Sequence, residues 1–141
     1  MTEEEVAKQA VDPDYAALAA FRLALRRFAA FSETEAKAAG LTPRQHQALL
    51  TVKGLTPAGS HGIGVREIAD HLLIRHNSAV ELVDRLVEAG LATRQADPSD
   101  GRRILVSLTS RSELLLQRLS AAHMRELRTI RPALLALLQT F

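Results

Sequence analysis

The stretch over residues 75–108 constrains the fold of this chain more than any other part of it. Up to Gly90 its apolar residues recur with helical spacing, which predicts an amphipathic helix with a polar outer face. The apolar segments 91–94 and 104–108 then flank the polar turn DPSDGRR, whose proline and glycine predict a β-hairpin. A polar-faced helix joined to a hairpin tipped by arginines can contact duplex DNA twice, in the major groove and at the backbone or minor groove.

A short helix is predicted just before this stretch, over residues 65–72, where apolar residues follow the i, i+3, i+4, i+7 spacing. A break near Leu73 and Ile74 separates it from the following helix. Two short helices joined by a tight turn predict a helix-turn-helix. Arg75 stands where a serine, threonine or aspartate cap is expected, so the pattern does not fix the start of the second helix.

Further helices are predicted on the N-terminal side. After a loosely docked arm over residues 1–13, a long helix is expected over residues 14–40, ending at Gly40 in a left-handed cap. The run TPRQ at residues 42–45 offers a threonine cap, a first-turn proline and a glutamine three positions after the cap. It predicts a helix to about Lys53, with Gly54 as its stop. A loop follows, in which Ile63 is a candidate for a short strand that pairs with the hairpin.

On the C-terminal side, Ser110 and Glu113 predict a capping box for a helix over about residues 111–129. Pro132 is expected to end that helix, and residues 132–141 to form a last short helix that is apolar nearly all round. So short a helix cannot bury every face against its own chain, which indicates a second subunit as its cover.

The resulting fold class is mainly α with a small β-hairpin wing, in a single domain over residues 1–141. We expect a winged helix-turn-helix DNA-binding lobe at 42–108 and a helical dimerisation layer built from 14–40 and 110–141.

Composition excludes several classes of protein. The hydrophobic fraction of 47% and the charged fraction of 24% are those of an ordinary globular protein. The absence of cysteine excludes disulfides, thiolate zinc sites and cysteine redox sensors. The acidic start does not resemble a secretory signal and no apolar run is long enough to span a bilayer, so we expect a cytoplasmic protein. The net charge of +2 favours a nucleic-acid partner only weakly, so the placement of the arginines must carry that argument.

Three motifs, VREIADHL at 65–72, SAVELVDRLVEAGL at 78–91 and DPSDGRRILVSLT at 97–109, resemble those of the multiple-antibiotic-resistance regulator (MarR) family. The resemblance runs from about Leu18 to Phe141. It implies a homodimeric transcription regulator, more often a repressor than an activator, whose ligand-free form binds a pseudo-palindromic operator. It also implies no cofactor. Aromatic acids are frequent effectors in the family, bound in a cleft between the dimer layer and the DNA-binding lobe.

The resemblance assigns DNA contacts to residues of the recognition helix and the wing. These are Arg75, His76, Asn77, Ser78, Arg85, Arg94, Arg102 and Arg103. Arg102 would enter the minor groove, with Arg103 beside it on phosphate. Asp100 beside Arg102 could brace the tip by a charge-assisted hydrogen bond. The alternatives are a solvated helix start for Asn77 and Ser78 and a soluble hairpin tip for Arg102 and Arg103. For Arg85 the alternative is an ion pair with a carboxylate such as Asp84 or Glu88.

The five histidines show no paired ligand spacing, so no metal site is expected. His46 and His123 fall on helices that flank the implied cleft, where a neutral imidazole could bond an acidic effector. Phe28 and Arg22 would supply an apolar wall and an anion partner. The alternative is that all four are core or interface residues.

Three functions remain open: a ligand-responsive DNA-binding repressor, a winged helix that binds protein without DNA, and a small enzyme. The sequence has no serine–histidine–acid set, phosphate loop or paired catalytic carboxylates at useful spacing, so the enzyme is the weakest of the three. The wing-tip arginines favour DNA, because a purely protein-binding module has no need of that turn.

Overall fold

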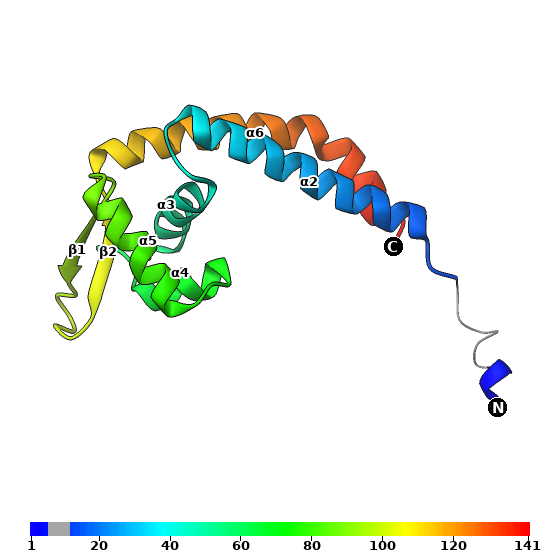
Figure 1. The fold of residues 1–141 in the computed structure, drawn as a ribbon, viewed down its shortest axis with the longest axis horizontal. Coiled ribbons are helices and arrows are strands. Elements are labelled where there is room, and N and C mark those ends of the chain that lie inside the picture. The colour runs from blue at the N-terminus through cyan, green and yellow to red at the C-terminus, as the bar shows by residue number, and fades with distance from the viewer. Residues whose placement is uncertain (6–11) are drawn as a thin grey trace.

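The computed structural model describes residues 1–5 and 12–141. A lobe of short helices and one hairpin sits at one end of two long helices that lie side by side (Figure 1). From Tyr15 onward the elements are α2 (Tyr15–Ala38), α3 (Pro43–Leu55), α4 (Val65–Leu72), α5 (His76–Glu88), β1 (Ala92–Ala96), β2 (Ile104–Leu108) and α6 (Ser110–Gln139). The predicted fold class, mainly α with a small β-hairpin wing, is confirmed. The arm predicted over residues 1–13 includes 6–11, which lie outside the described residues.

The helix ends around residues 14, 40 and 42 are capped, at Gly40 and Thr42 as predicted. Asp14 Oδ1 accepts the Ala17 amide at 2.9 Å and begins α2, while Gly40 takes a φ of 80° just after its end. Thr42 and Gln45 form the predicted capping box of α3, with N···O distances of 3.0 and 3.1 Å. The predicted stop at Gly54 is wrong, because α3 continues to Leu55 and the Thr56 amide still donates to Val52 O at 3.1 Å.

The turn between α4 and α5 has a strained backbone. Leu73 adopts φ 55° and ψ 43°, the left-handed region that a leucine rarely occupies. This conformation lets the Ile74 amide donate to Ala69 O at 3.0 Å and redirects the chain into α5. Arg75 is the N-cap of α5 and makes no side-chain capping bond, so the local helix signal that the sequence lacks is also missing in the structure.

The hairpin pairs β1 with β2 in antiparallel register, from Ala92 opposite Leu108 to Ala96 opposite Ile104. β1 extends beyond the predicted end at Arg94. Ile63 joins the hairpin as predicted: its amide donates to Val106 O at 3.1 Å and its carbonyl accepts the Val106 amide at 2.7 Å.

Two predictions about the last helix are wrong. Its cap is Thr109 rather than Ser110, because Thr109 and the buried Ser112 exchange side-chain-to-amide bonds of 3.3 and 3.0 Å. Pro132 does not end the helix, and α6 passes through it to Gln139. Proline already has a helical φ and sacrifices one hydrogen bond there. The chain beyond it packs back on α2, where the Phe141 ring lies 6.2 Å from that of Phe21.

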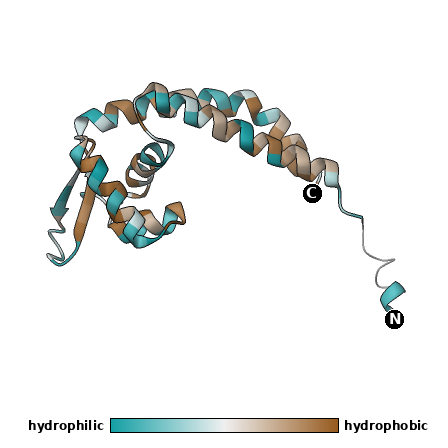
Figure 2. Ribbon diagram, viewed as in Figure 1, coloured by the Kyte–Doolittle hydropathy of each residue, from teal (hydrophilic) through white to brown (hydrophobic). Residues whose placement is uncertain are grey.

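The hydrophobic core lies where the lobe meets the C-terminal end of α2 and the N-terminal part of α6. Every helix and strand of the lobe contributes to it, together with the adjoining parts of α2 and α6. Its residues are Ala36, Leu41, Ala48, Leu49, Val52, Ile63, Ile68, Leu82, Val83, Leu86, Leu91, Ala92, Val106, Leu116 and Leu119. Figure 2 shows apolar residues on the elements around this core and also along the halves of α2 and α6 that lie away from the lobe. In the described part of the chain, no helix combines the length and apolar character that a membrane crossing needs.

Candidate DNA interface and effector pocket

The first turn of α5 presents polar side chains because its apolar residues are turned inward. Ala79, Val83 and Leu86 are fully buried against the lobe. This leaves Arg75, His76 and Asn77 exposed and Ser78 half-buried at the start of the helix. An exposed helix start with amide, imidazole and hydroxyl groups suits hydrogen bonding to base edges and phosphates.

The turn at the hairpin tip is held by its own carboxylates. Asp97 Oδ1 accepts the Ser99 amide at 3.0 Å and the Ser99 hydroxyl at 2.8 Å, and these bonds hold the pKa of Asp97 below its usual value. Asp100 Oδ1 accepts the backbone amide of Arg102 at 3.1 Å. The brace expected from Asp100 is therefore made to the backbone and not to the guanidinium. It fixes the turn and leaves the exposed Arg102 side chain free to extend.

The other arginines of the predicted interface differ in their pairing. Arg94 forms an ion pair with Asp84 on α5, and Arg103 forms one with Glu67 on α4. Arg85 is exposed and, within the described residues, makes no ion pair with either of the carboxylates expected for it. Nothing in the sequence indicated Glu67 as the partner of Arg103, from which it lies 36 residues away, and the sequence suggested Asp84 as a partner of Arg85 rather than of Arg94.

A pocket of about 560 Å³ opens between α2, α3 and α6, the position of the implied cleft. Three of the four candidate ligand residues, Phe28, His46 and His123, line it. The exposed Arg22 is not among its lining residues, so the structure does not bring the expected anion partner to this pocket. Glu33 lines the pocket instead.

The two histidines of the pocket are in contact, with ring centroids 4.9 Å apart. His123 Nδ1–H donates to Leu119 O at 2.6 Å, and its Nε2 lies 2.8 Å from the Ser32 hydroxyl, which ties α6 to α2. His46 on α3 is only 3% exposed, and its buried Nδ1 has no hydrogen-bond partner among the residues that the structure describes. Burial, and secondarily the neighbouring His123, lower the pKa of His46, so its imidazole is neutral near pH 7.

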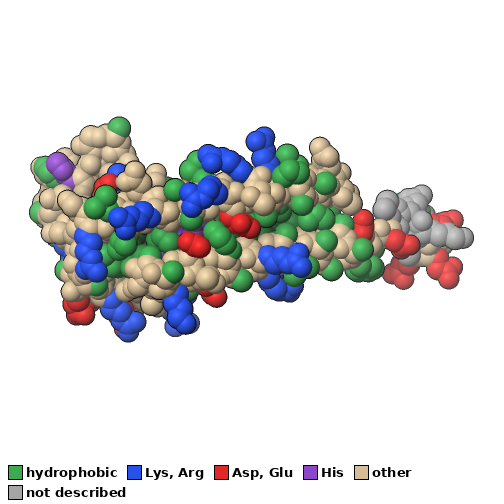
Figure 3. Space-filling view, turned by 90° about the horizontal axis from the view of Figure 1, so that it is seen from above, with side chains coloured by type: hydrophobic (Ala, Val, Ile, Leu, Met, Phe, Trp, Pro, Cys, Tyr) green, Lys and Arg blue, Asp and Glu red, His purple; other side chains and the backbone are tan. Residues whose placement is uncertain are grey.

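One face of the α2–α6 arm is apolar and uncovered. Figure 3 shows hydrophobic side chains running lengthwise along the arm between groups of basic side chains. Residues exposed by more than two-fifths include Leu18, Leu23, Leu25, Met124, Leu127, Leu135, Leu138 and Phe141. So large an apolar surface is typical of a protein–protein contact.

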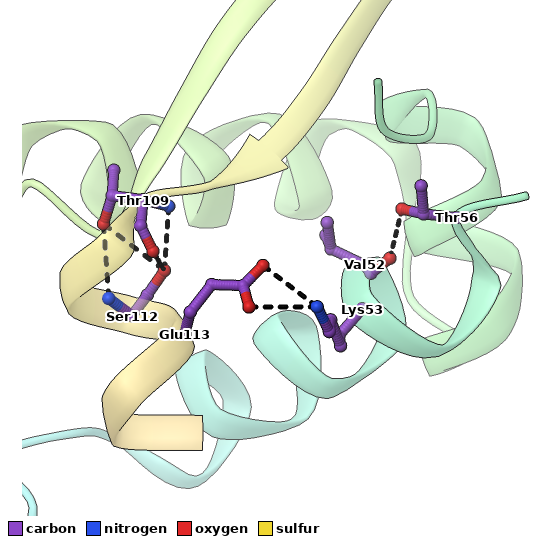
Figure 4. A network of polar contacts seen from close by, with 6 residues as sticks. All are labelled: Val52, Lys53, Thr56, Thr109, Ser112 and Glu113. Carbon is purple, nitrogen blue, oxygen red and sulfur yellow. Dashed lines mark hydrogen bonds and ion pairs between the residues drawn. The ribbon is translucent and has the colours of Figure 1, made fainter. Parts of the chain in front are cut away.

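The arm and the lobe are also joined by an ion pair near the start of α6. Lys53 Nζ donates to both carboxylate oxygens of Glu113, at 2.9 and 3.1 Å, beside the Thr109–Ser112 cap (Figure 4). Both side chains are about half exposed, so the pair adds little to stability, of the order of 0–1 kcal/mol.

A family model described as MarR family matches residues 39–103. A probable transcriptional regulator from Pseudomonas aeruginosa is 32% identical, with 79% of this chain and 80% of that chain covered and a TM-score of 0.58. CouR from Rhodococcus jostii, solved with p-coumaroyl-CoA, is 25% identical, with coverage of 94% and 91% and a TM-score of 0.69. An S. aureus MepR variant solved with an oligodeoxyribonucleotide is 19% identical, with coverage of 86% and 84% and a TM-score of 0.65.

A comparison with curated proteins gives no significant match. The Pseudomonas protein is described as a probable transcriptional regulator, and none of the matches reported above is described as an enzyme. The family model covers the helix-turn-helix, β1 and the hairpin turn and ends just before β2, and the Pseudomonas relative extends the likeness to most of the chain. This chain therefore belongs to the MarR family of winged-helix transcription regulators.

Proposed function

We propose that the protein is a homodimeric repressor that binds a pseudo-palindromic operator and is released by a small aromatic ligand. The observation that carries the DNA-binding part is the joint presentation of the polar start of α5 and the Arg102 tip. The two are held in one unit, because β1 follows α5 directly and β2 is bonded to Ile63 ahead of α4. In this proposal α5 enters the major groove and Arg102 enters the adjacent minor groove.

The dimer is proposed from the uncovered apolar face of the arm. Residues 14–40 and 110–141 would form the dimerisation layer and residues 42–108 the DNA-binding lobe. A two-fold axis through the arm would place two α5 helices on successive major-groove turns, about 10 base pairs apart. Such a regulator acts on chromosomal DNA, which places it in the cytoplasm.

The effector is proposed to bind in the pocket between α2, α3 and α6. Its apolar lining and its two contacting histidines suit an aromatic compound with a polar group. Because α3 begins the lobe and α2 and α6 form the arm, a ligand held there would change the angle between them and hence the spacing of the two α5 helices.

The deciding experiment is an electrophoretic mobility shift with the DNA upstream of the protein's own gene, at two salt concentrations. We expect a shifted complex that a large excess of unrelated duplex does not compete away. Failure to bind duplexes of any sequence in dilute buffer would overturn the function and would favour a protein-binding winged helix. Aromatic acids that raise the melting temperature in a thermal-shift screen should then release the labelled duplex.

A further inference from the structure

We propose that Arg103 is a positioning residue and not a phosphate contact: its ion pair with Glu67 sets the direction of the wing so that Arg102 reaches the minor groove. The inference rests on the proposed DNA-binding function and changes the role expected for Arg103. It also gives Glu67, a residue with no expected role, a part in DNA recognition.

Glu67 uses its two carboxylate oxygens to join the wing to the start of α4. Oε1 accepts from the Arg103 guanidinium. Oε2 accepts the backbone amide of Gly64, the N-cap of α4, at 3.0 Å. Since the Gly64 bond fixes the carboxylate, the position of the Arg103 side chain is fixed relative to the helix-turn-helix.

The guanidinium also lies against the backbone of Gly64. A Cβ placed on Gly64 would be 3.5 Å from Arg103 Nε and 3.6 Å from Nη2, which is van der Waals contact. Gly64 itself is buried. Arg103 is therefore seated on the segment ahead of α4 and does not extend freely from the hairpin.

The backbone of Arg103 closes the turn that carries Arg102. Its amide donates to Asp100 O at 3.0 Å, and its carbonyl accepts the Asp97 amide at 2.8 Å. Fixing the side chain of Arg103 thus fixes the closing residue of the turn. Arg102, its neighbour, has its own amide bonded to Asp100. The path from Glu67 to the wing tip is a continuous set of bonds.

Farther from the tip, β2 contacts the segment ahead of α4 through the backbone. Ile63 is paired with Val106, and a Cβ on Gly62 would lie only 2.1 Å from Val106 O, so the two backbones are as close as they can be. Among the described residues, Arg103–Glu67 is the ion pair nearest the tip. A wing fixed at its base and at Arg103 has little freedom left to swing.

The two possible roles of Arg103 predict opposite effects of changing Glu67. If Arg103 binds phosphate, the pair must break on DNA binding, so Glu67→Gln would free the arginine, remove a negative charge near DNA and tighten binding. If Arg103 positions the wing, Glu67→Gln weakens binding. Glutamine keeps an oxygen for the Gly64 amide and so preserves the start of α4.

The experiment measures the affinity of the full-length protein for a fluorescein-labelled duplex selected by the wild type, over a range of salt concentrations. The variants are Glu67→Gln, Arg103→Ala, Glu67→Ala and the double Glu67→Ala/Arg103→Ala, which leaves the net charge unchanged. Arg102→Ala is the reference for a direct contact. We expect each variant of the pair to weaken binding about two- to fivefold, since both side chains are part-exposed.

The double variant should be no weaker than Arg103→Ala alone, and its dependence on salt should equal that of the wild type. Arg102→Ala should lower the slope of log affinity against log salt by about one. Hydrogen exchange at residues 97–103 of the DNA-free protein should be faster in every variant of the pair. The melting temperature should be unchanged in Glu67→Gln and Arg103→Ala, and lower in the two variants with Glu67→Ala, which also lose the bond to the Gly64 amide.

Tighter binding by Glu67→Gln, or a slope lowered by about one in the double variant, would overturn the positioning role and restore the phosphate contact. Unchanged exchange at the wing would also overturn it. A wild-type protein that binds no duplex would overturn the proposed function itself, so the two failures are distinguishable.

Discussion

Arg102 is the side chain on which the proposed recognition of the minor groove depends. It is exposed at the tip of the turn, while its backbone is held by Asp100. Replacing it with alanine should weaken operator binding by about 1–3 kcal/mol and lower the salt dependence, because one inserted cation is lost. Binding titrations at two salt concentrations measure both effects. Arg44→Ala, an exposed arginine on α3, is the control, and an equal loss in that variant would contradict a specific contact.

Leu73 carries strain that a substitution can release. Its left-handed backbone costs an L-residue about 1–2 kcal/mol, and its side chain is 91% exposed and buries little in return. Glycine adopts this backbone freely but costs about 0.5–1 kcal/mol of chain entropy. Leu73→Gly should leave the free energy of unfolding unchanged or raise it by up to about 1 kcal/mol, as measured by urea denaturation.

The control for that variant is Leu72→Gly, in the last turn of α4, which should destabilise the fold because it removes a side chain packed on the core. If Leu73→Gly lowers the free energy of unfolding as much as Leu72→Gly does, the strain at Leu73 is not real.

The residues of the candidate interface that could be predicted from sequence are those whose roles depend on near neighbours. The polar start of α5 follows from helical spacing, and the exposure of Arg102 follows from the turn DPSDGRR. The partners of Arg94 and Arg103 could not be predicted, since Asp84 and Glu67 reach them only after the hairpin folds back on the helices. Leu73 could not be identified as left-handed either, because nothing in its side chain favours that conformation.

Among the elements, α6 differs most from expectation. Sequence rules place a break at Pro132, yet the helix continues, because rules for single residues do not include the packing of the following turns on α2. Because the helix is continuous through this position, Pro132→Ala restores the backbone bond that proline cannot donate and removes the crowding of its ring against the preceding turn. We expect the free energy of unfolding to rise by about 1–3 kcal/mol at fixed protein concentration, with no loss of helical circular dichroism.

A decrease in stability on Pro132→Ala would indicate that the chain needs a bend at this position, as the sequence alone suggested. Ala133→Gly provides the comparison, since it weakens the same turn without restoring a hydrogen bond and should lower stability by about 1 kcal/mol.

The junction between α3 and the two long helices should respond to pH. The pKa of His46 is lowered from its ordinary value of 6.5, first by burial and then by His123. The unfolded chain has the ordinary pKa and the folded chain the lowered one. At a pH between the two, the unfolded chain binds more protons than the folded chain, so the free energy of unfolding falls as pH drops below about 6.5. Among the residues that line the same pocket, Glu33 is the acidic one.

His46→Gln removes this titration and should show a smaller loss of stability between about pH 7.5 and about pH 5.5 than the wild type. Denaturant unfolding at both pH values measures it. His61→Gln, at an exposed loop position, should behave as the wild type does. Equal pH dependence in all three proteins would mean that His46 is not buried at this junction in solution.

At the scale of the whole molecule, the net charge of +2 is small for a protein proposed to bind DNA. On the wing and its neighbours, two of the arginines are already paired with carboxylates, which leaves Arg102 as the cation at the tip. One such lobe therefore makes few phosphate contacts. Two lobes, held at a fixed spacing by the arm, double these contacts and turn a weak single-site affinity into a tighter joint one. DNA binding by this chain should thus depend strongly on the dimer.

Deleting residues 131–141 tests that dependence. The deletion removes Leu135, Leu138 and Phe141 from the uncovered face, and with them the contact of Phe141 on Phe21. The lobe should remain folded, since its core lies at the opposite end of the arm. We expect the truncated protein to be monomeric or insoluble, as measured by sedimentation velocity, and to bind a duplex with two half-sites no better than one with a single half-site. A truncated protein that remains a well-folded dimer would show that the interface lies elsewhere on the chain.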